Sequence, residues 1–567
     1  MFDLVVRGGQ VVDGTGRAPF EADVAMEGGR IVAVGEVQAR GTEEIDARGR
    51  IVTPGFVDIH THYDGHAVWA ERLNPSSYHG VTTSVMGNCG VGFAPCRPSD
   101  RDRLVSLMEG VEDIPEVVLT AGLTWDWESF PDYLNRLAER RYDMDVAAYL
   151  PHAPLRVFVM GERAAAREPA TPDDVRQMRV LAREAMNAGA MGFSTSRTLN
   201  HRARDGWLTP SYAAGEDELT GIGQALREVG SGALQLISDF EAVDVEFDML
   251  ERVAAASRRP LWISLMQHAW EPERWRAVLD RIEQANARGV QIKAQVAPRP
   301  IGALLGLELF QHPFSRCPSY APIADLPFEQ RRLALADPEL RARLIAEQPD
   351  SIVGLRAKAW SLDNLFPMTD PPNYEPAPET SIAAVARARG ISPVEYAYDL
   401  LLEDGGKRII YMPTSNYVGC SSDATRTMLR HDQTLVGLGD GGAHCSTICD
   451  ASFPTYLMAR WVGDRAGAFP LERAVQMLTA DNAAAMGLTD RGQIRLGARA
   501  DLNVIDLDHI GLHIPEMVYD LPMGQGRLRQ RSRGYDATVV AGAVTYREGE
   551  ATGVLPGRLV RGSAGLH

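Results

Sequence analysis

Two histidines separated by a single residue, His60 and His62, close the apolar segment 53–62. Alternate side chains of an extended strand share one face, so both imidazoles would point in the same direction. Two imidazoles at this spacing can hold one Zn²⁺ through bonds of about 2.0–2.1 Å. A solvated or structural pair is the commoner outcome, but the apolar strand and the Pro-Gly approach at residues 54–55 favour metal binding. The sequence therefore predicts a metal site at the end of this strand.

Two glycine-rich segments offer further side chains for such a site. Cys89 lies in the turn at residues 85–92, and Asp440 lies in residues 436–444, each after an apolar run. Glycines leave room for a ligand to approach the backbone closely. A free cysteine is more often a small buried residue, and an aspartate flanked by glycines also suits a plain turn. Both alternatives stay open from the residues alone.

A repeated strand and helix pattern would position these side chains. From residue 51 to about residue 485, short apolar runs alternate with amphipathic segments such as 173–188, 216–228, 247–256 and 271–288. Repeated strand–helix units predict a parallel sheet with right-handed crossovers, and their number favours a closed (β/α)8 barrel. The C-terminal ends of the barrel strands would then bring distant ligands together.

The two chain ends have a different sequence pattern, in which short apolar segments typical of strands are separated by glycine turns. This pattern predicts an antiparallel β-sandwich built from both termini. The expected division is residues 1–52 for the N-terminal part of the sandwich, 53–485 for the barrel and 486–567 for the C-terminal part. Residues 300–375 interrupt the repeat with prolines and one helix near 326–347, which predicts a lid or pocket wall.

The chain has 567 residues, 45% of them hydrophobic, and a net charge of −17 from 58 Lys and Arg against 75 Asp and Glu. This composition predicts a large core and argues against nucleic-acid or anionic-membrane partners, which call for a basic face. The sequence lacks a run of about 18 apolar residues for a membrane span, and its N-terminus is typical of a strand, not of an export signal. Six scattered cysteines fit a reducing compartment, so we expect a cytoplasmic protein.

In combination, these segments resemble the amidohydrolase superfamily and, within it, the D-aminoacylase (N-acyl-D-amino-acid deacylase) group. The resemblance covers nearly the whole chain and keeps the order of the family's motifs at residues 55–64, 79–83, 87–90, 125–130 and 192–196, with 497–502 similar to a returning sandwich strand. It implies a distorted (β/α)8 barrel, a sandwich of both termini and metal-assisted hydrolysis of a C–N bond. It also implies a small-molecule amide as partner, and we expect a homo-oligomer.

The same resemblance assigns roles to four residues. His60 and His62 match the metal ligands of the first strand. Cys89 matches a cysteine that ligates or bridges metal, and Asp440 matches the aspartate that ends the last barrel strand. A carboxylate in that place can take a proton from metal-activated water and pass it to the leaving nitrogen, so Asp440 is our candidate for the general base and acid.

Two histidines of the family pattern are absent. The position expected on the fifth strand holds Ser238, and the position on the sixth holds Leu265, with Gln267 in place of a lysine near the substrate. Leucine cannot bind zinc, so we expect one zinc per chain, held by the four residues above. Asp239 or His268 would replace the missing ligands if the alignment shifts by one to three residues. If the alignment does not shift, Gln267 and His268 are candidates to bind the substrate.

Other side chains near the predicted strand ends complete the expected site. His152 matches a family position that would donate a hydrogen bond to the carbonyl oxygen, although a buried structural histidine fits equally well. Arg197 and Arg299 are candidates to clamp a substrate carboxylate, with internal ion pairs as the alternative. His444 is a candidate to orient Asp440, or a turn residue.

These observations favour a zinc-dependent hydrolase of linear amides, with an N-acyl amino acid or a related acyl amide as substrate. Two alternatives stay open. One is a cyclic-amide or lactone hydrolase on the same scaffold, which would need no carboxylate clamp. The other is a non-catalytic binding protein that has lost part of its metal site.

Overall fold

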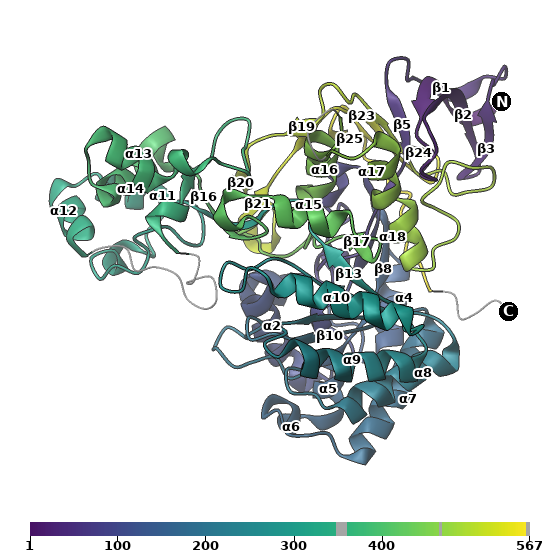
Figure 1. The fold of residues 1–567 in the computed structure, drawn as a ribbon, viewed down its shortest axis with the longest axis horizontal. Coiled ribbons are helices and arrows are strands. Elements are labelled where there is room, and N and C mark those ends of the chain that lie inside the picture. The colour runs from purple at the N-terminus through teal and green to yellow at the C-terminus, as the bar shows by residue number, and fades with distance from the viewer. Residues whose placement is uncertain (348–359, 464–467, 563–567) are drawn as a thin grey trace.

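Strands and helices alternate along most of the chain in the computed structural model, which describes residues 1–347, 360–463 and 468–562. Several sheets with helices packed around them give a mixed α/β architecture (Figure 1). The mixed α/β class predicted from the sequence is therefore confirmed.

The two ends of the chain meet in one nine-stranded sheet. β5 pairs antiparallel with β18, so that Val52 lies opposite Val504. These two valines and Leu4 belong to one hydrophobic cluster made by residues from both ends of the chain. The strands in spatial order are β25 (Glu550–Ala551), β24 (Ala543–Arg547), β23 (Tyr535–Val540), β18 (Leu502–Ile505), β5 (Ile51–Pro54), β1 (Phe2–Val11), β2 (Phe20–Glu27) and β3 (Arg30–Gly35), with β4 (Gly41–Asp46) paired to β1.

The parallel strands of the middle of the chain form a three-stranded and a six-stranded sheet. The first contains β6 (Phe56–Asp58), β7 (Val81–Met86) and β8 (Asp145–Ala148). The second has the order β17 (Thr434–Val436), β13 (Ile292–Val296), β12 (Leu261–Ser264), β11 (Ala233–Ser238), β10 (Gly192–Arg197) and β9 (Leu150–Pro151). β8 and β9 are separated by Tyr149 alone, and an isolated parallel bridge joins Thr61 to Gly441. The two sheets therefore adjoin at both edges.

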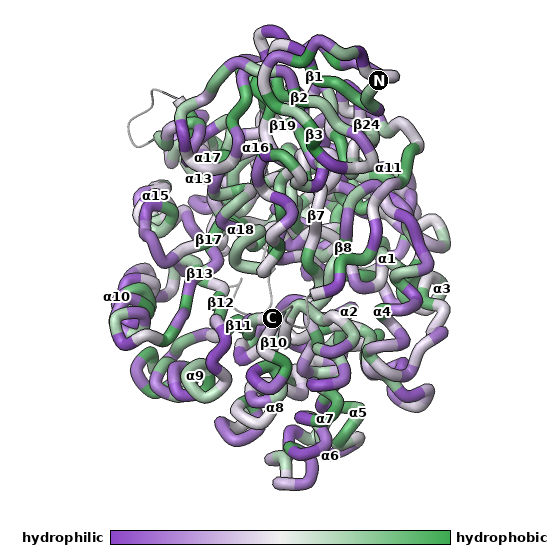
Figure 2. The backbone as a smooth tube through the Cα atoms, turned by 90° about the vertical axis from the view of Figure 1, so that its right-hand side faces the viewer, coloured by the Kyte–Doolittle hydropathy of each residue, from purple (hydrophilic) through white to green (hydrophobic). Residues whose placement is uncertain are grey.

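Amphipathic helices pack around these strands close to where the sequence periodicity predicts them. In α7, Thr171 and Asp174 form a capping box, a proline occupies the first turn, and Gly189 ends the helix with a φ of 105°. Figure 2 shows hydrophilic and hydrophobic colours alternating along α8, α9 and α10, as expected for helices with one buried face. Their bounds are α7 (Pro172–Ala188), α8 (Glu216–Val229), α9 (Val243–Ser257) and α10 (Arg274–Ala287).

The segment between β13 and β17 has a hydrophobic core of its own. Leu305, Tyr398 and Met412 belong to that separate cluster. Figure 1 shows α11–α14 grouped at the left, away from the nine-stranded sheet. The elements are β14 (Ile301–Leu305), α11 (Phe328–Leu335), α12 (Pro338–Glu347), β15 (Phe366–Pro367), α13 (Ile382–Arg389), α14 (Pro393–Leu402) and β16 (Ile410–Ser415). Residues 348–359 of the predicted insertion lie outside the described residues.

The single helix predicted near residues 326–347 is wrong. The segment forms two helices, α11 and α12, and the second begins at Pro338. Proline has no amide hydrogen for the helix ladder, and its ring disfavours the helical conformation in the residue before it. Ala336 and Asp337 therefore separate the two helices.

The remaining helices connect or flank the sheets. They are α1 (His66–Trp69), α2 (Arg101–Glu112), α3 (Glu116–Gly122), α4 (Phe130–Ala138), α5 (His152–Met160), α6 (Glu162–Ala165), α15 (Asp423–Leu429), α16 (Phe453–Trp461), α17 (Leu471–Leu478) and α18 (Ala480–Ala485). Two short antiparallel pairs join β19 (Gly511–Leu512) to β22 (Ser532–Arg533) and β20 (Glu516–Val518) to β21 (Arg527–Arg529). Within the part of the chain that the structure describes, no helix combines the length and apolar character that a membrane crossing requires.

Candidate metal centre

The two histidines of the predicted metal site lie just beyond β6. The side chains of His60 and His62 are each about 1% exposed, and their ring centroids are 5.5 Å apart. One nitrogen of each ring and the Sγ atom of Cys89 lie within 4.8 Å of one another. The structure therefore brings these three predicted ligands together in one buried group.

Cys89 reaches this group because the turn after β7 bends sharply. Its φ is 57°, a conformation that is uncommon for residues other than glycine, and Gly87 and Gly90 on either side have φ of 78° and 69°. The Cys89 N–H donates to Oε1 of Gln235 over 2.9 Å. The turn thus directs the Cys89 Sγ to within 3.3 Å of the His60 Nε2.

Asp440 approaches the two histidines from the loop after β17. Its Oδ1 atom is 3.4 Å from the Nε2 of His60 and 3.5 Å from the Nε2 of His62. The Asp440 side chain is 25% exposed. Burial raises the pKa of this carboxyl, but the hydrogen bond with His62 and the charge of His60 outweigh burial and leave the pKa well below its usual range. Asp440 is therefore ionised at neutral pH.

The donor set suits a zinc ion. A tetrahedral zinc with bonds of about 2.0–2.3 Å keeps its ligand atoms about 3.3–3.7 Å apart. The separations between Cys89 and His60, and between Asp440 and each histidine, are 3.3, 3.4 and 3.5 Å. Imidazole nitrogen, thiolate sulfur and carboxylate oxygen are the usual zinc ligands. His60, His62 and Cys89 therefore suit zinc in their chemistry and lie close to one another, and Asp440 lies close to both histidine rings.

The outer ring nitrogens of the two histidines face acceptors that sequence reasoning missed. The Nδ1 of His60 is 2.6 Å from the amide Oε1 of Gln295 on β13. The Nδ1 of His62 is 3.3 Å from the carboxylate Oε1 of Glu112 at the end of α2. The hydrogen bond with Gln295 places the ring hydrogen of His60 on Nδ1 and leaves its Nε2 free to bind a metal, whereas the contact of His62 with Glu112 is an ion pair. Neither acceptor lies in a recognisable motif, so no pattern of residues pointed to either.

Burial sets the protonation of the metal-free site. Burial lowers the pKa of His60 to about 4, so this ring is neutral and can act as a ligand. For His62, burial also lowers the pKa, but the charge of Glu112 raises it well above the ordinary value. Burial raises the pKa of the Cys89 thiol to about 11. Metal binding here would therefore displace protons from His62 and Cys89.

A further histidine, His201, lies near this group and was also missed. Its Nδ1 is 2.8 Å from the hydroxyl of Ser196 on β10. Burial, with smaller contributions from the charges of His62 and His444, lowers the pKa of His201 to about 3. The charges of the metal group therefore act on His201. Its sequence signal is weak, since it lies four residues beyond the end of β10 in an irregular loop.

Comparison with known proteins identifies the family. The model of the amidohydrolase family matches residues 43–546 of this chain, which is most of its length. This chain belongs to the amidohydrolase family. The resemblance inferred from the motifs is therefore confirmed.

Relatives of this amidohydrolase match along the full chain. N-acyl-D-glutamate deacylase of Alcaligenes xylosoxydans xylosoxydans is 27% identical over 100% of this chain and 97% of that protein. D-aminoacylase of the same organism is 27% identical over 99% of this chain and 98% of that protein. The crystal structure of an N-acyl-D-glutamate deacylase from Bordetella bronchiseptica, complexed with zinc and a phosphonate inhibitor, has a TM-score of 0.64 and 24% identity over 99% of both chains.

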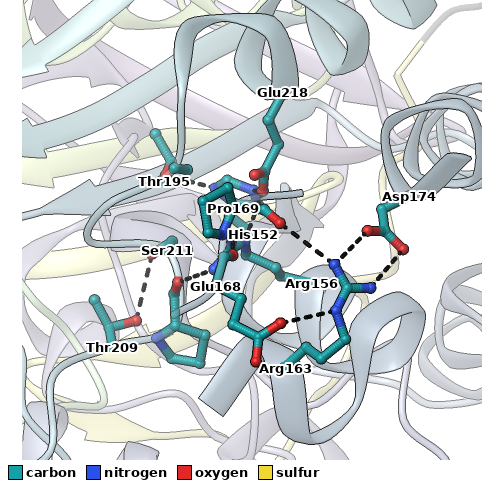
Figure 3. A network of polar contacts seen from close by, with 12 residues as sticks. His152, Arg156, Arg163, Glu168, Pro169, Asp174, Thr195, Thr209, Ser211 and Glu218 are labelled. Atoms are coloured by element: carbon teal, nitrogen blue, oxygen red, sulfur yellow. Dashed lines mark hydrogen bonds and ion pairs between the residues drawn. The ribbon is translucent and has the colours of Figure 1, made fainter. Parts of the chain in front are cut away.

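His152 of the amidohydrolase lies in a buried ion network (Figure 3). Its Nδ1 is 2.8 Å from the Thr195 hydroxyl, and its Nε2 is 2.8 Å from Oε1 of Glu218. The same carboxylate oxygen accepts a hydrogen bond from Arg156 over 2.8 Å. The His152 side chain is fully buried, and both ring nitrogens have partners in the protein. This geometry favours the alternative of a structural histidine over a hydrogen-bond donor to substrate.

The two arginines expected to clamp a carboxylate also have internal partners. The guanidinium of Arg197 contacts both carboxylate oxygens of Glu246, with Nη2 at 3.1 Å from Oε2. Arg299 is 1% exposed and pairs with Asp450 at 2.9 Å, beneath the ring of Tyr374 at 3.7 Å. For both arginines, these contacts favour the alternative of an internal ion pair over a clamp for a substrate carboxylate.

The strand ends that lack the family histidines are occupied by internal contacts. The Ser238 hydroxyl donates to Glu246 over 3.1 Å. Asp239 accepts hydrogen bonds from the Thr198 hydroxyl at 2.5 Å and from a backbone amide at 2.7 Å. Leu265 is 4% exposed and packs in the main hydrophobic cluster. Among the described residues, the group of ligand atoms within 4.8 Å of one another includes neither Asp239 nor His268. The alternative that one of these residues replaces a missing histidine ligand is therefore not supported.

Three neighbouring candidates also form contacts within the protein. The Gln267 N–H donates to the side chain of Asn416 over 2.8 Å. His268 stacks on Trp270 with ring centroids 4.3 Å apart, and its Nδ1 is 3.1 Å from the Ser415 hydroxyl. The Nε2 of His444 is 3.9 Å from Oε2 of Glu112. His444 thus faces Glu112, and its two candidate roles, orienting Asp440 or serving as a turn residue, stay predictions.

Proposed function

We propose that this amidohydrolase uses one zinc ion to hydrolyse a linear amide bond in a small molecule. The observation that carries the proposal is the buried group of His60, His62 and Cys89, with the partly exposed Asp440 at hydrogen-bond distance from both rings. Two relatives that match along nearly the full chain are named N-acyl-D-glutamate deacylase and D-aminoacylase, which supports a linear amide as the bond that is broken.

We also propose that the parallel strands close into a distorted (β/α)8 barrel. The support is the adjacency of the two parallel sheets at β8 and β9 and at the bridge between Thr61 and Gly441. In such a barrel all side chains of the metal group lie at the C-terminal ends of strands. The corresponding domains are a β-sandwich from residues 1–52 and 486–567, and a barrel from 53–485 with a lid at about 300–375.

The chemistry follows from the residues of the group. Zinc bound by His60, His62 and Cys89 would lower the pKa of a water molecule and polarise the amide carbonyl. Asp440 is the most exposed member of the group, so its carboxylate can reach a water that enters from the open side. Its lowered pKa keeps it in the deprotonated state that a general base requires. Asp440 then takes a proton from water and delivers it to the leaving nitrogen.

The substrate class that we propose is an N-acyl amino acid or a related acyl amide. The names of the relatives, N-acyl-D-glutamate deacylase and D-aminoacylase, support the acylated amine. Arg197 and Arg299 have internal carboxylate partners, so neither guanidinium supplies a clamp for a substrate carboxylate. Because no carboxylate clamp is assigned, we include uncharged acyl amides among the proposed substrates together with N-acyl amino acids.

A substrate panel tests this proposal. The zinc-loaded protein is incubated with N-acyl-D-amino acids, N-acyl-L-amino acids, uncharged acyl anilides and cyclic amides, and the released amine is measured. We expect release from at least one linear amide, and its loss after zinc is removed by a chelator. Hydrolysis confined to cyclic amides, or linear-amide hydrolysis that survives complete removal of metal, would refute the proposal.

A further inference from the structure

The end of helix α2 contacts both a histidine of the metal group and the loop that follows Asp440. Glu112 is the last residue of α2 and is 2% exposed. One carboxylate oxygen lies 3.3 Å from the Nδ1 of His62, and the other lies 3.9 Å from the Nε2 of His444. A buried carboxylate is costly unless it is paired, and these two imidazoles are the partners at its two oxygens.

We propose that Glu112 is a positioning residue of the metal centre, whose buried carboxylate forms an ion pair with the Nδ1 side of His62 and holds that ring with Nε2 toward the metal group. The inference rests on the proposed function only in assuming that zinc binds to this group. Glu112 touches neither a substrate nor a reacting atom in this assignment, and it acts through His62.

Backbone contacts hold Glu112 in place. The Glu112 carbonyl accepts a hydrogen bond from the N–H of His444, and the next carbonyl, that of Asp113, accepts one from Cys445 over 3.3 Å. The Asp113 carboxylate also accepts hydrogen bonds from the hydroxyls of Ser446 and Thr447, each over 3.1 Å. The end of α2 is therefore fastened to the loop that carries Asp440. This connection fixes the position of His62 relative to Asp440.

The acceptors at the two histidines differ in charge. His60 has the neutral amide of Gln295 at its Nδ1, whereas His62 has the carboxylate of Glu112. A carboxylate next to an imidazole raises the basicity of the ring through its charge, which a neutral amide does not do. We therefore assign to Glu112 the electrostatic support of His62, and to Gln295 the hydrogen bond that orients His60.

Zinc affinity of the metal-free enzyme tests the assignment. The dissociation constant is measured by competition with a chromogenic chelator, without substrate. Glu112→Gln keeps the shape of the side chain but removes its charge, and we expect zinc to bind about 10–100-fold more weakly. The control Glu109→Gln, on the same helix, removes a carboxylate that pairs with the exposed Arg204 at 3.3 Å, and its zinc affinity should equal that of the wild type.

The absorption spectrum of the cobalt-substituted enzyme gives a second readout, because ligand-field bands respond to the geometry at the metal and not to general stability. We expect the bands to shift in Glu112→Gln and to stay unchanged in Glu109→Gln. If Glu112→Gln does not fold, Glu112→Asp replaces it, because it keeps the charge but withdraws the carboxylate by one methylene. Weaker zinc binding with shifted bands in the folded variant supports the inference.

Wild-type zinc affinity with an unchanged cobalt spectrum in a folded Glu112 variant would overturn the inference. The proposed function fails in a different experiment, namely the substrate panel with the wild-type enzyme. A wild-type protein that binds zinc but hydrolyses no amide would refute the proposed function and leave the role of Glu112 intact.

Discussion

Two groups of strand ends in this amidohydrolase differ in what their side chains contact. The ligand side consists of His60, His62, Cys89 and Asp440. The His60 Nε2 lies 3.3 Å from the Cys89 Sγ, and the Asp440 Oδ1 lies 3.4 and 3.5 Å from the Nε2 atoms of His60 and His62. The packed side consists of Ser238, Asp239, Leu265 and His268, at and just beyond the ends of β11 and β12. Each polar group of the packed side has a hydrogen-bond partner in the protein, and Leu265 is buried among apolar residues.

The difference supports our proposal that this scaffold holds one metal ion, on the ligand side. A metal position needs several donor atoms that converge and are not committed elsewhere. On the packed side, Glu246 engages Ser238, Thr198 engages Asp239, and leucine has no donor atom. The ligand side keeps its donors converged because Gln295 and Glu112 hold the outer ring nitrogens. We therefore expect one zinc per chain.

Replacing His60 with alanine should have the largest effect. It removes one ligand of the buried group, so we expect zinc content to fall close to zero and amide hydrolysis to fall more than about 10³-fold, since metal catalysis contributes several kcal/mol. Metal content by plasma mass spectrometry and hydrolysis of the best panel substrate check this. His268→Ala is the matched control on the packed side and should keep its zinc. Full activity in His60→Ala would show that the ligand side is not the catalytic centre.

Replacing Asp440 with asparagine should have the next largest effect. The amide keeps the size of the side chain but cannot take a proton, so we expect turnover to fall by about 10²-fold or more. The effect should appear in kcat and not in KM, because Asp440 is assigned to the chemical step. Zinc content is measured in parallel, so that loss of a ligand is separated from loss of the base. A kcat within a factor of two of the wild type would move the proton transfer to another group, with His201 as the first candidate.

The sequence signals for the ligand side are local, and the structure brings three of its residues, His60, His62 and Cys89, into one buried group. His60 and His62 are two residues apart on one strand, and Cys89 and Asp440 each follow an apolar run within a glycine-rich turn. The regular helices were also predicted closely, since an amphipathic period is a property of adjacent residues. The exception was the helix at 326–347, where Pro338 was a local signal that the periodicity concealed.

Partners that are distant in the sequence could not be predicted in this way. Arg197 and Glu246 are 49 residues apart, and His62 meets Glu112 through a helix that carries no motif. Whether an arginine at a strand end clamps a substrate or pairs internally depends on a carboxylate supplied by another element. That carboxylate is chosen by the tertiary packing, which residue types and spacing alone do not specify.

A histidine at position 265 tests whether the packed side can accept a metal. Leu265→His puts a polar ring into a hydrophobic cluster, so we expect the free energy of unfolding to fall by about 1–3 kcal/mol. Zinc content should stay at about one per chain, because a single new donor has no convergent partners. Denaturant unfolding and metal analysis measure the two quantities, and Leu265→Met serves as the apolar control. A second tightly bound zinc with undiminished stability would contradict the distinction between the two sides.

The smallest expected effect concerns the pH dependence of stability at His268. Burial lowers the pKa of this ring to about 4, with a further contribution from the charge of Arg274. Between about pH 6.5 and pH 4 the unfolded chain then binds more protons at this residue than the folded protein does, so the contribution of His268 to stability is lost as the pH falls through that window. Because the ring is partly exposed, we expect the free energy of unfolding to fall by about 1–2 kcal/mol over this window. This is less than the upper limit, which is about 1.4 kcal/mol for each unit by which the pKa is lowered.

His268→Gln should remove that contribution. Denaturant unfolding of the wild type and the variant between pH 7 and pH 4 measures this, and we expect their free energies of unfolding to converge as the pH falls. The same measurement with and without zinc separates the two sides of the site. A packed-side histidine titrates independently of the metal, so the difference between wild type and variant should be the same in both conditions. A difference that grows when zinc is added would mean that His268 binds the metal, and the packed side would then have to be counted among the ligands.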